Sequence, residues 1–320
     1  MDRWSGVLKV PLYANSRTCY QVAASLCLSS TSKSLAVPSA NAIFFNGDRV
    51  AGTGNQVIER LSDLQNIAEI LVSKIGGSIN AWVIEASVFN GPFAVYKDFI
   101  PSVNQFGEPE SYNPTGFPAS ESTISLLSNC IKEVKRVSLQ RQKESSLPSI
   151  SSSEFYDPKT FIFGFSKGGT VVNQLVTELG FSELRSYRDP SPIEELPQII
   201  PSTKESFLNS ITEIHYVDVG LNSAGAYLTD SDVIEKISRK LVEEGEGSEK
   251  MRFVLHGTPR QWCDSGRSWI HNEKEKLLHL LQSEGQRSGG KLKVSERFYF
   301  ADKPPDLQMH FEIIEKLEVS

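Results

Sequence analysis

Cysteine is scarce in this sequence, and the few that occur lie far apart. Only four are present among 320 residues, at Cys19, Cys27, Cys130 and Cys263, and none forms a Cys-x-x-Cys pair. So few and so scattered cysteines exclude the disulfide framework of small secreted domains and the common zinc motifs. We therefore expect free thiols in an intracellular protein, cytoplasmic or mitochondrial.

Long hydrophobic runs and an excess of positive charge are also absent. The longest apolar runs fall far short of the roughly 20 residues that a membrane-spanning helix requires. The formal net charge is -6, which is opposite in sign to a surface that attracts a phosphate backbone. The sequence therefore predicts no transmembrane segment and no nucleic-acid partner, and it specifies no oligomeric state.

What the sequence does contain is a regular alternation of short apolar runs with segments of helical periodicity. Strands are expected at 6–10, 20–28, 42–45, 81–84, 160–165, 213–219, 251–255 and 291–300. Helices are expected at 61–75, 124–137, 167–179, 230–243, 268–283 and 307–317. This alternation predicts one α/β domain over residues 1–320, with a mainly parallel eight-stranded sheet and helices on both faces. Two Pro- and Gly-rich excursions, at about 87–119 and 181–206, are placed to cover a site at the carboxyl edge of the sheet.

The segment Gly164-Phe-Ser-Lys-Gly168 carries the clearest chemical signal. It matches the Gly-x-Ser-x-Gly pattern, in which a strand turns sharply into a helix and holds the serine at the apex. A buried strand before it and apolar residues at helical spacing after it supply the context that the pattern requires. Because strand and helix nearly touch there, positions two before and two after the serine favour glycine. Ser166 is therefore the candidate nucleophile.

A nucleophilic serine needs a base, and the base needs an acid that orients it. In the order serine, acid, histidine, the base should follow the last strand, and His310 does so. For the acid we favour Asp264, in the loop after the penultimate strand, over its rival Asp218 at the end of the strand before. Cys263 is a weaker alternative nucleophile, since no basic partner stands beside it in the sequence.

The oxyanion of an acyl-transfer reaction needs backbone N–H donors from two segments. One is expected at Lys167, which follows the serine. The other is expected at Gly47 and Asp48, in the loop after the third strand. A plain Asn-Gly turn is the alternative interpretation of that loop.

Four segments together resemble a poorly characterised eukaryotic family of α/β-hydrolase-like proteins. They are Phe44-Phe-Asn-Gly-Asp48, Gly164-Phe-Ser-Lys-Gly168, Tyr216-Val-Asp-Val-Gly220 and His256-Gly-Thr-Pro-Arg-Gln-Trp-Cys-Asp264. The resemblance implies the α/β-hydrolase fold, a serine esterase or lipase-like activity and, for the animal members, a mitochondrial location. This sequence departs from many hydrolases in having Asn46 where a histidine often precedes the glycine.

The leading functional hypothesis is a serine hydrolase that acts on a small-molecule or lipid ester, or on a thioester, through Ser166, His310 and Asp264. Such chemistry requires neither a metal nor an organic cofactor. Four phenylalanines of the first excursion are candidates for an apolar acyl pocket or for a lid's own core: Phe89, Phe93, Phe99 and Phe106. The alternative is a catalytically silent protein that keeps the fold as a binding or scaffold module.

Overall fold

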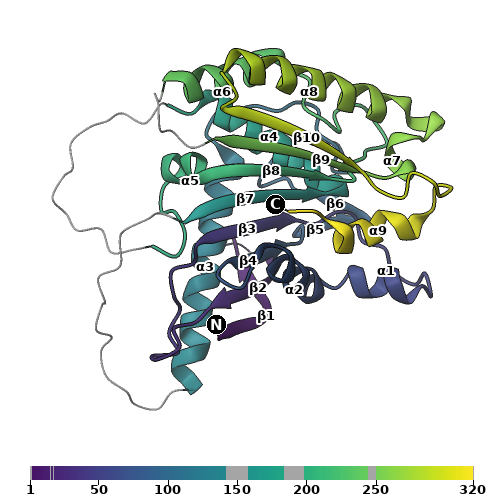
Figure 1. Cartoon of the computed structure of the whole chain (residues 1–320). Coiled ribbons are helices and arrows are strands. Elements are labelled where there is room, and N and C mark those ends of the chain that lie inside the picture. Colours follow the sequence, from purple (N-terminus) through teal and green to yellow (C-terminus); the bar gives the residue numbers. More distant parts are fainter. Residues whose placement is uncertain are drawn as a thin grey trace.

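A single eight-stranded sheet forms the centre of the computed structural model, which describes residues 2–14, 16, 18–141, 158–183, 198–243 and 250–319 (Figure 1). In spatial order the strands are β1 (Arg3–Pro11), β2 (Cys19–Cys27), β4 (Asn80–Ile84), β3 (Ala40–Phe45), β7 (Lys159–Phe165), β8 (Ile211–Val217), β9 (Met251–Gly257) and β10 (Leu292–Phe298). From β4 to β10 the neighbours pair in parallel, whereas β2 pairs antiparallel with both β1 and β4. The sheet is therefore mixed rather than purely parallel.

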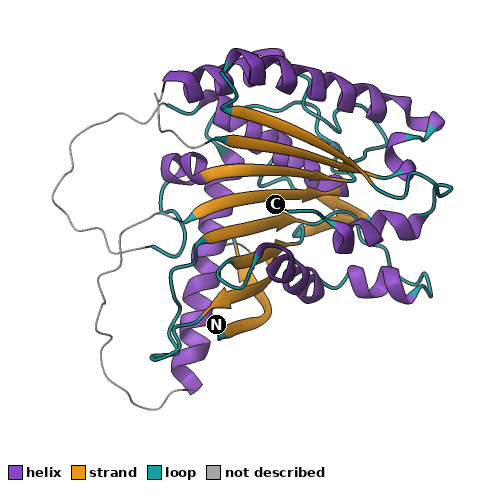
Figure 2. Ribbon diagram, viewed as in Figure 1, coloured by secondary structure: helices purple, strands orange, loops and turns teal. Residues whose placement is uncertain are grey.

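Helices cover both faces of this sheet, as the purple ribbons on either side of the orange strands show (Figure 2). One face is packed by α1 (Gln56–Leu61), α2 (Leu64–Ile75) and α9 (Leu307–Lys316). The other is packed by α3 (Pro118–Arg141), α4 (Gly169–Phe181), α5 (Lys204–Ser210), α6 (Ser231–Glu243) and α8 (Ser268–Arg287). This strand order with helices on both faces is the α/β-hydrolase fold, as the sequence predicts.

The central strands form because their residues are mostly apolar on both faces, whereas the edge strands β1 and β10 are partly exposed. In β3 and β4 every residue is buried. In β7 every residue is buried except Lys159 and Phe161. A strand that is buried on both sides belongs in the middle of a sheet that helices cover twice. Most helices bury one stripe; α9, for example, buries five residues of its ten: Met309, His310, Phe311, Ile313 and Ile314. The exception is α4, which is buried on all sides from Gly169 to Gly180.

The register of the parallel strands brings distant residues to one edge. Phe45 of β3 pairs with Gly164 of β7, and Phe165 of β7 pairs with Val217 of β8. Val217 in turn pairs with His256 of β9. The residues that directly follow these strands therefore meet at the carboxyl edge, where ligand sites of open α/β sheets occur.

The first excursion is more ordered than the sequence indicates. It contains a two-stranded hairpin, β5 (Val88–Asn90) with β6 (Phe93–Val95), and its last residues already belong to α3. Glycine and proline mark the turns of such a stretch, but its strands are too short to show a pattern. Most of the second excursion, residues 184–197, lies outside the described residues, as does the serine-rich connector before β7.

Candidate active site

Ser166 stands where β7 ends and the chain turns into α4, through a short 3₁₀ turn at Ser166–Gly168. Its φ is 52°, in the left-handed region that a residue with a Cβ rarely occupies. A Cβ on Gly164 would lie 2.5 Å from Val172 Cγ2, and one on Gly168 would lie 2.0 Å from the carbonyl oxygen of Phe45. Glycine at these two positions is thus what allows strand, helix and neighbouring strand to meet so closely around the serine.

His310 and Asp218 meet at the same edge. Nδ1 of His310 lies 2.6 Å from Oδ2 of Asp218, a distance typical of a charge-assisted hydrogen bond. Asp218 directly follows β8 with a φ of 45°, so it too holds an uncommon backbone conformation. Its carboxylate is fully buried and also accepts hydrogen bonds from Thr258, through the backbone N–H at 2.7 Å and the hydroxyl at 3.0 Å. These bonds fix the carboxylate against the imidazole.

Asp264, which we favour from the sequence as the orienting acid, is elsewhere. Its side chain is exposed at the protein surface, where it accepts from the N–H of Gly266 and pairs with Arg267 at 2.9 Å. Arg267 lowers the pKa of this carboxyl group by hydrogen bonding to it. The partner of His310 is therefore corrected from Asp264 to its rival Asp218. The physical reason is local: the short helix α7 (Pro259–Trp262) separates Asp264 from the end of β9, and the Asp264 side chain caps the turn that follows, at Ser265–Arg267.

His310 is held from two sides. Asp306 caps the start of α9 by accepting from the N–H of Met309 at 2.7 Å, which places His310 in the first turn of the helix. The imidazole packs on the ring of Phe165, the residue directly before Ser166, and the two ring centroids are 4.6 Å apart. Within the described ranges no hydrogen bond yet joins the imidazole to Ser166 Oγ. Such bonds are often long in unliganded hydrolases and tighten when substrate binds.

The loop after β3 reaches the serine from the other side. A Cβ on Gly47 would lie 2.5 Å from Cβ and 3.0 Å from Oγ of Ser166, so this backbone touches the nucleophile candidate. In the described part of the chain the N–H groups of Gly47 and Asp48 donate to no protein acceptor, whereas those of Asn46 and Arg49 do. Lys167 lies in the first turn after β7, where helix N–H groups lack partners. The expected oxyanion donors are thus brought to one place.

Of the four phenylalanines considered for an acyl pocket, Phe99 is fully buried in the main core against Tyr20 and Phe45. Phe93 and Phe106 instead form an edge-to-face pair, with ring centroids 5.4 Å apart, and Phe106 is 40% exposed. Phe89 is half-buried, and the guanidinium carbon of Arg49 lies 3.8 Å from the centre of its ring.

Two histidines that lie within strands form a separate buried network. His215 Nδ1 lies 3.0 Å from His256 Nε2, and His256 Nδ1 lies 2.9 Å from the hydroxyl of Tyr299. His215 Nε2 completes the series with Glu213 at 3.1 Å. Burial lowers the pKa of both imidazoles. The sequence places them in strands but gives no sign that they contact each other.

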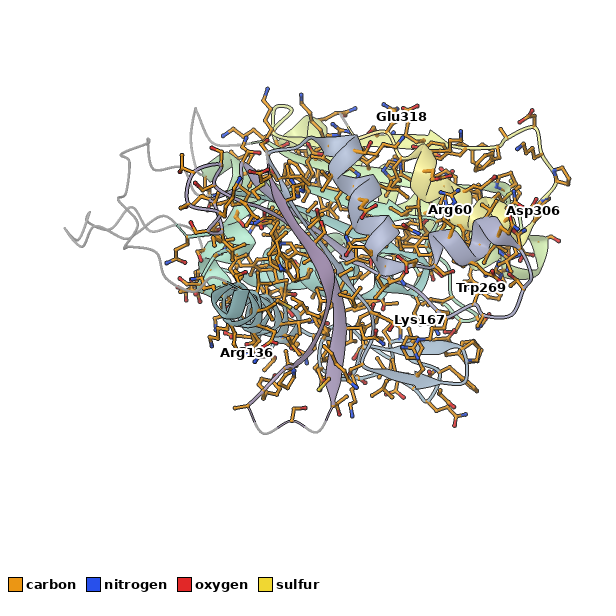
Figure 3. The ribbon with its side chains drawn as sticks, turned by 90° about the horizontal axis from the view of Figure 1, so that it is seen from below. Arg60, Arg136, Lys167, Trp269, Asp306 and Glu318 are labelled. Atoms are coloured by element: carbon orange, nitrogen blue, oxygen red, sulfur yellow. The ribbon has the colours of Figure 1, made fainter. Side chains whose placement is uncertain are left out.

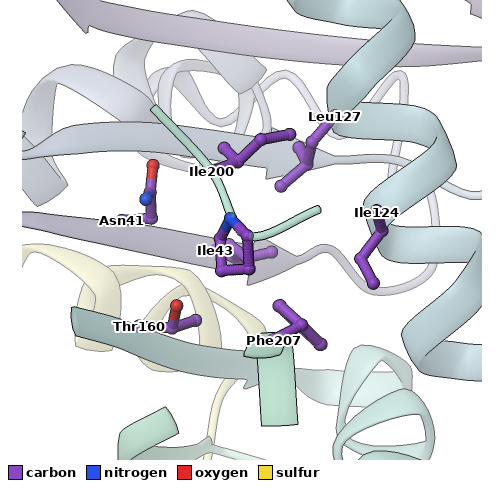
Figure 4. A pocket seen from close by; sticks show the side chains of 8 residues that line it. Asn41, Ile43, Ile124, Leu127, Thr160, Ile200 and Phe207 are labelled. Atoms are coloured by element: carbon purple, nitrogen blue, oxygen red, sulfur yellow. The ribbon is translucent and has the colours of Figure 1, made fainter. Parts of the chain in front are cut away.

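A small pocket lies at the opposite, amino end of the strands, where Figure 4 shows its lining side chains. Its empty volume is about 210 Å³ and its lining is mostly apolar. The polar residues there are already bonded: Asn41 to Trp82 and to the carbonyl of Ile199, and Thr160 to Ser210. None of its lining residues is a candidate catalytic residue of the Ser166 site.

In the described ranges no helix is both long enough and apolar enough to traverse a bilayer. Nor do histidine, cysteine, aspartate and glutamate side chains gather there into a group suited to a metal ion.

The sequence matches the C2orf69 family profile over residues 119–286, just over half of the chain. The chain belongs to the C2orf69 family. Curated C2orf69 relatives are named mitochondrial proteins: the zebrafish (Danio rerio) homolog is 25% identical over 260 residues, and the human protein is 25% identical over 287 residues. Each alignment covers 79% of this chain, but it spans only 64% of the zebrafish and 66% of the human C2orf69 protein.

Solved structures with a similar course of the chain include hydrolases. The siderophore hydrolase EstA from Aspergillus nidulans is 11% identical with a TM-score of 0.44, covering 98% of this C2orf69 chain and 93% of that one. Esterase 2 of Thermogutta terrifontis is 9% identical with a TM-score of 0.43, covering 98% of this chain and 90% of that one. Likenesses at this level say nothing of substrate or activity.

Proposed function

We propose that this protein is a serine hydrolase that cleaves carboxylic esters or thioesters. The observation that carries the proposal is the Asp218–His310 hydrogen bond, which is buried at the same sheet edge as the strained Ser166 turn. The three residues come from three different elements, and a purely structural requirement gives no reason for them to converge. A carboxylate on Nδ1 fixes the tautomer that leaves Nε2 free to accept a proton.

In the first step Ser166 Oγ attacks the acyl carbon and its proton passes to Nε2 of His310. The electron pair of the carbonyl bond moves to the carbonyl oxygen, whose negative charge the N–H groups at residues 47, 48 and 167 stabilise. When that oxyanion collapses, the bond to the leaving group breaks, and His310 returns its proton to the departing alkoxide or thiolate. The products of this step are an acyl-Ser166 ester and a free alcohol or thiol.

In the second step water replaces the leaving group. His310 takes a proton from the water, the resulting hydroxide attacks the acyl carbon, and Ser166 leaves with that proton. Asp218 stabilises the imidazolium that forms in both steps. Only water and the chain's own residues take part, so the steps need no metal and no organic cofactor.

The substrate class in this proposal is a small-molecule or lipid ester, since the exposed Phe93–Phe106 pair offers an apolar surface. We extend the mitochondrial location in the relatives' names to this chain as part of the same proposal.

The proposal is tested by hydrolysis of p-nitrophenyl esters from acetate to palmitate, and of the matching thioesters, by the full chain. We expect turnover with at least one chain length and its loss in Ser166→Ala. A well-folded wild type that hydrolyses none of them faster than Ser166→Ala would contradict the proposal.

A second candidate is a catalytically silent binding module on the same fold. It is favoured by the missing Ser166–His310 hydrogen bond and by the small exposure of Ser166, 8%. A crystal structure of the phosphonylated protein discriminates, because the active site predicts an adduct on Ser166 whose phosphoryl oxygen meets the N–H groups of Gly47 and Lys167.

A further inference from the structure

Lys167, the residue after Ser166, has a buried ammonium group. Its side chain is only 2% exposed, although lysine is almost never buried without a partner (Lys167 is labelled in Figure 3). Nζ donates to the carbonyl oxygen of Phe106 at 2.6 Å and lies 4.6 Å from the centre of the Phe93 ring. The charged group to which it is paired is Asp48, with Nζ and Oδ1 3.3 Å apart.

Asp48 is the residue after Gly47, and its carboxylate has two partners. The oxygen that pairs with Lys167 also accepts from the N–H of Ala94 at 2.7 Å. Burial raises the pKa of this carboxyl group and lowers the pKa of Lys167, and each charge opposes the other's shift. Asp48 also interacts electrostatically with His310, so the carboxylate lies within range of the proposed base.

The ion pair therefore joins the two segments that supply the proposed oxyanion donors. Gly47 touches Ser166 through the backbone, and one residue further along each segment Asp48 meets Lys167 through the side chains. A carboxylate so near a developing oxyanion would oppose it, because like charges repel more strongly in a site shielded from water. An ammonium group paired to that carboxylate removes the opposition.

We propose that Lys167 and Asp48 are a positioning pair for the oxyanion hole. Their contact holds the N–H groups of residues 47, 48 and 167 toward one point, and the ammonium of Lys167 cancels the unfavourable field of the Asp48 carboxylate there. This inference rests on the proposed hydrolase function and adds two side chains that act on the reaction without touching the reacting atoms.

The test compares Lys167→Met, Asp48→Asn and the double variant in the full chain. Readouts are kcat and KM on the best ester and the rate at which a fluorophosphonate labels Ser166. In Lys167→Met the carboxylate is left without its cation, so we expect kcat and the labelling rate to fall by about 10²-fold, as when an oxyanion donor is lost, with KM little changed. In Asp48→Asn the amide oxygen still accepts from Ala94, and we expect a loss of about tenfold, the size of a coupling between contacting residues.

The double variant gives the decisive result. Because the opposing carboxylate is gone, Asp48→Asn/Lys167→Met should be about tenfold more active than Lys167→Met alone. A residue that only anchors the loop through packing would give no such rescue, since a second substitution in the anchor would add to the damage.

The chain offers a matched control in Lys274. It is 3% exposed, pairs with Glu296 at 2.9 Å and also with Glu275, and lies 4.6 Å from the Trp262 ring, so it too is a buried ammonium group between a carboxylate and an aromatic ring. Lys274→Met should lower the melting temperature as much as Lys167→Met while leaving kcat within about threefold of the wild type, because its charge does not face the oxyanion.

Two results would overturn the inference directly: a loss of kcat in Lys167→Met no larger than in Lys274→Met, and a double variant no more active than Lys167→Met. If Lys167→Met does not fold, Asp48→Asn decides, and an unchanged labelling rate in that variant rejects the pair. Absence of labelling in the wild type is a different failure, because it removes the proposed hydrolase function itself, and the pair with it.

Discussion

Replacing Asp218 by asparagine should disable the site without removing a side chain. Oδ1 of Asp218 accepts from the backbone N–H of Thr258, which can only donate, so the single oxygen of an asparagine must stay there. The NH₂ group then faces His310 Nδ1 at the position of Oδ2. A donor at that place forces the proton of the imidazole onto Nε2, and the imidazole can no longer take the proton of Ser166.

The expected loss follows from that tautomer. The same type of change in the serine protease triad lowers kcat by about 10⁴-fold, which corresponds to about 5.5 kcal/mol of transition-state stabilisation. We expect a comparable fall in kcat for Asp218→Asn on the best ester, with KM changed far less. Stability should fall by about 1–3 kcal/mol, because a buried charge-assisted bond is weakened.

The matched control is Asp264→Asn. That carboxylate pairs with Arg267 on the surface, where an ion pair contributes about 0–1 kcal/mol, so activity and stability should both stay near those of the wild type. Ester kinetics and urea unfolding of the two variants give the comparison. Equal losses in both, or a larger one in Asp264→Asn, would refute the reasoning about Asp218.

Two further predictions concern sterics and acid stability. Gly47→Ala places a Cβ 2.5 Å from Ser166 Cβ, so we expect a loss of about 1–3 kcal/mol in unfolding free energy and a loss of most activity. The control is Gly77→Ala, which should change neither quantity because a Cβ there meets nothing within 4 Å. Equal behaviour of the two variants would contradict the close contact between Gly47 and Ser166. Burial lowers the folded-state pKa of His215 and His256 below the unfolded value of about 6.5, so the unfolded chain binds protons first as the pH falls. Stability should therefore drop below pH ~6.5, by about 1.4 kcal/mol per pH unit for each histidine, until the folded-state pKa is reached. Urea unfolding between pH 7 and 5 should show a shallower slope in His256→Gln, and an identical slope would exclude His256 as a cause.

The order of strands and helices can be predicted from the sequence because the pattern is local. Each strand of the main sheet is a short run between turn residues, and every predicted strand has a counterpart within a few residues. The short helices α1, α5 and α7 are not among the predicted helices, because so few residues do not establish a helical period. What the pattern does not contain is the direction of pairing. The antiparallel pairing of β2 with β4 depends on contacts between residues about 60 positions apart, such as Val22 with Ile84.

The choice between two candidate acids likewise depends on contacts between residues that are distant in the sequence. Asp218 and Asp264 both follow a strand of the sheet, and the sequence ranks them by their usual place in the chain. The structure separates them through backbone geometry: Asp218 immediately follows its strand with a φ of 45°, and Thr258 supplies two donors to it. Burial by contacts 40 residues apart is a tertiary property, so a ranking by position alone selects a carboxylate that does not contact His310.

The Lys167–Asp48 contact is likewise invisible in the sequence, where the two residues are only candidates for backbone N–H donors. It arises because β3 and β7 are direct neighbours, so that residues three positions after the paired Phe45 and Gly164, which are Asp48 and Lys167, face each other. Register, rather than residue type, creates the pair.

The most direct measurement of the central claim is peptide mapping by mass spectrometry after the purified full chain reacts with a fluorophosphonate. The account predicts one phosphonyl adduct, located on Ser166, formed in the wild type and in Asp264→Asn, slowed severalfold or more in Asp218→Asn and absent from Ser166→Ala. A folded wild type that carries no adduct on Ser166, or that carries it on another residue, would contradict the account.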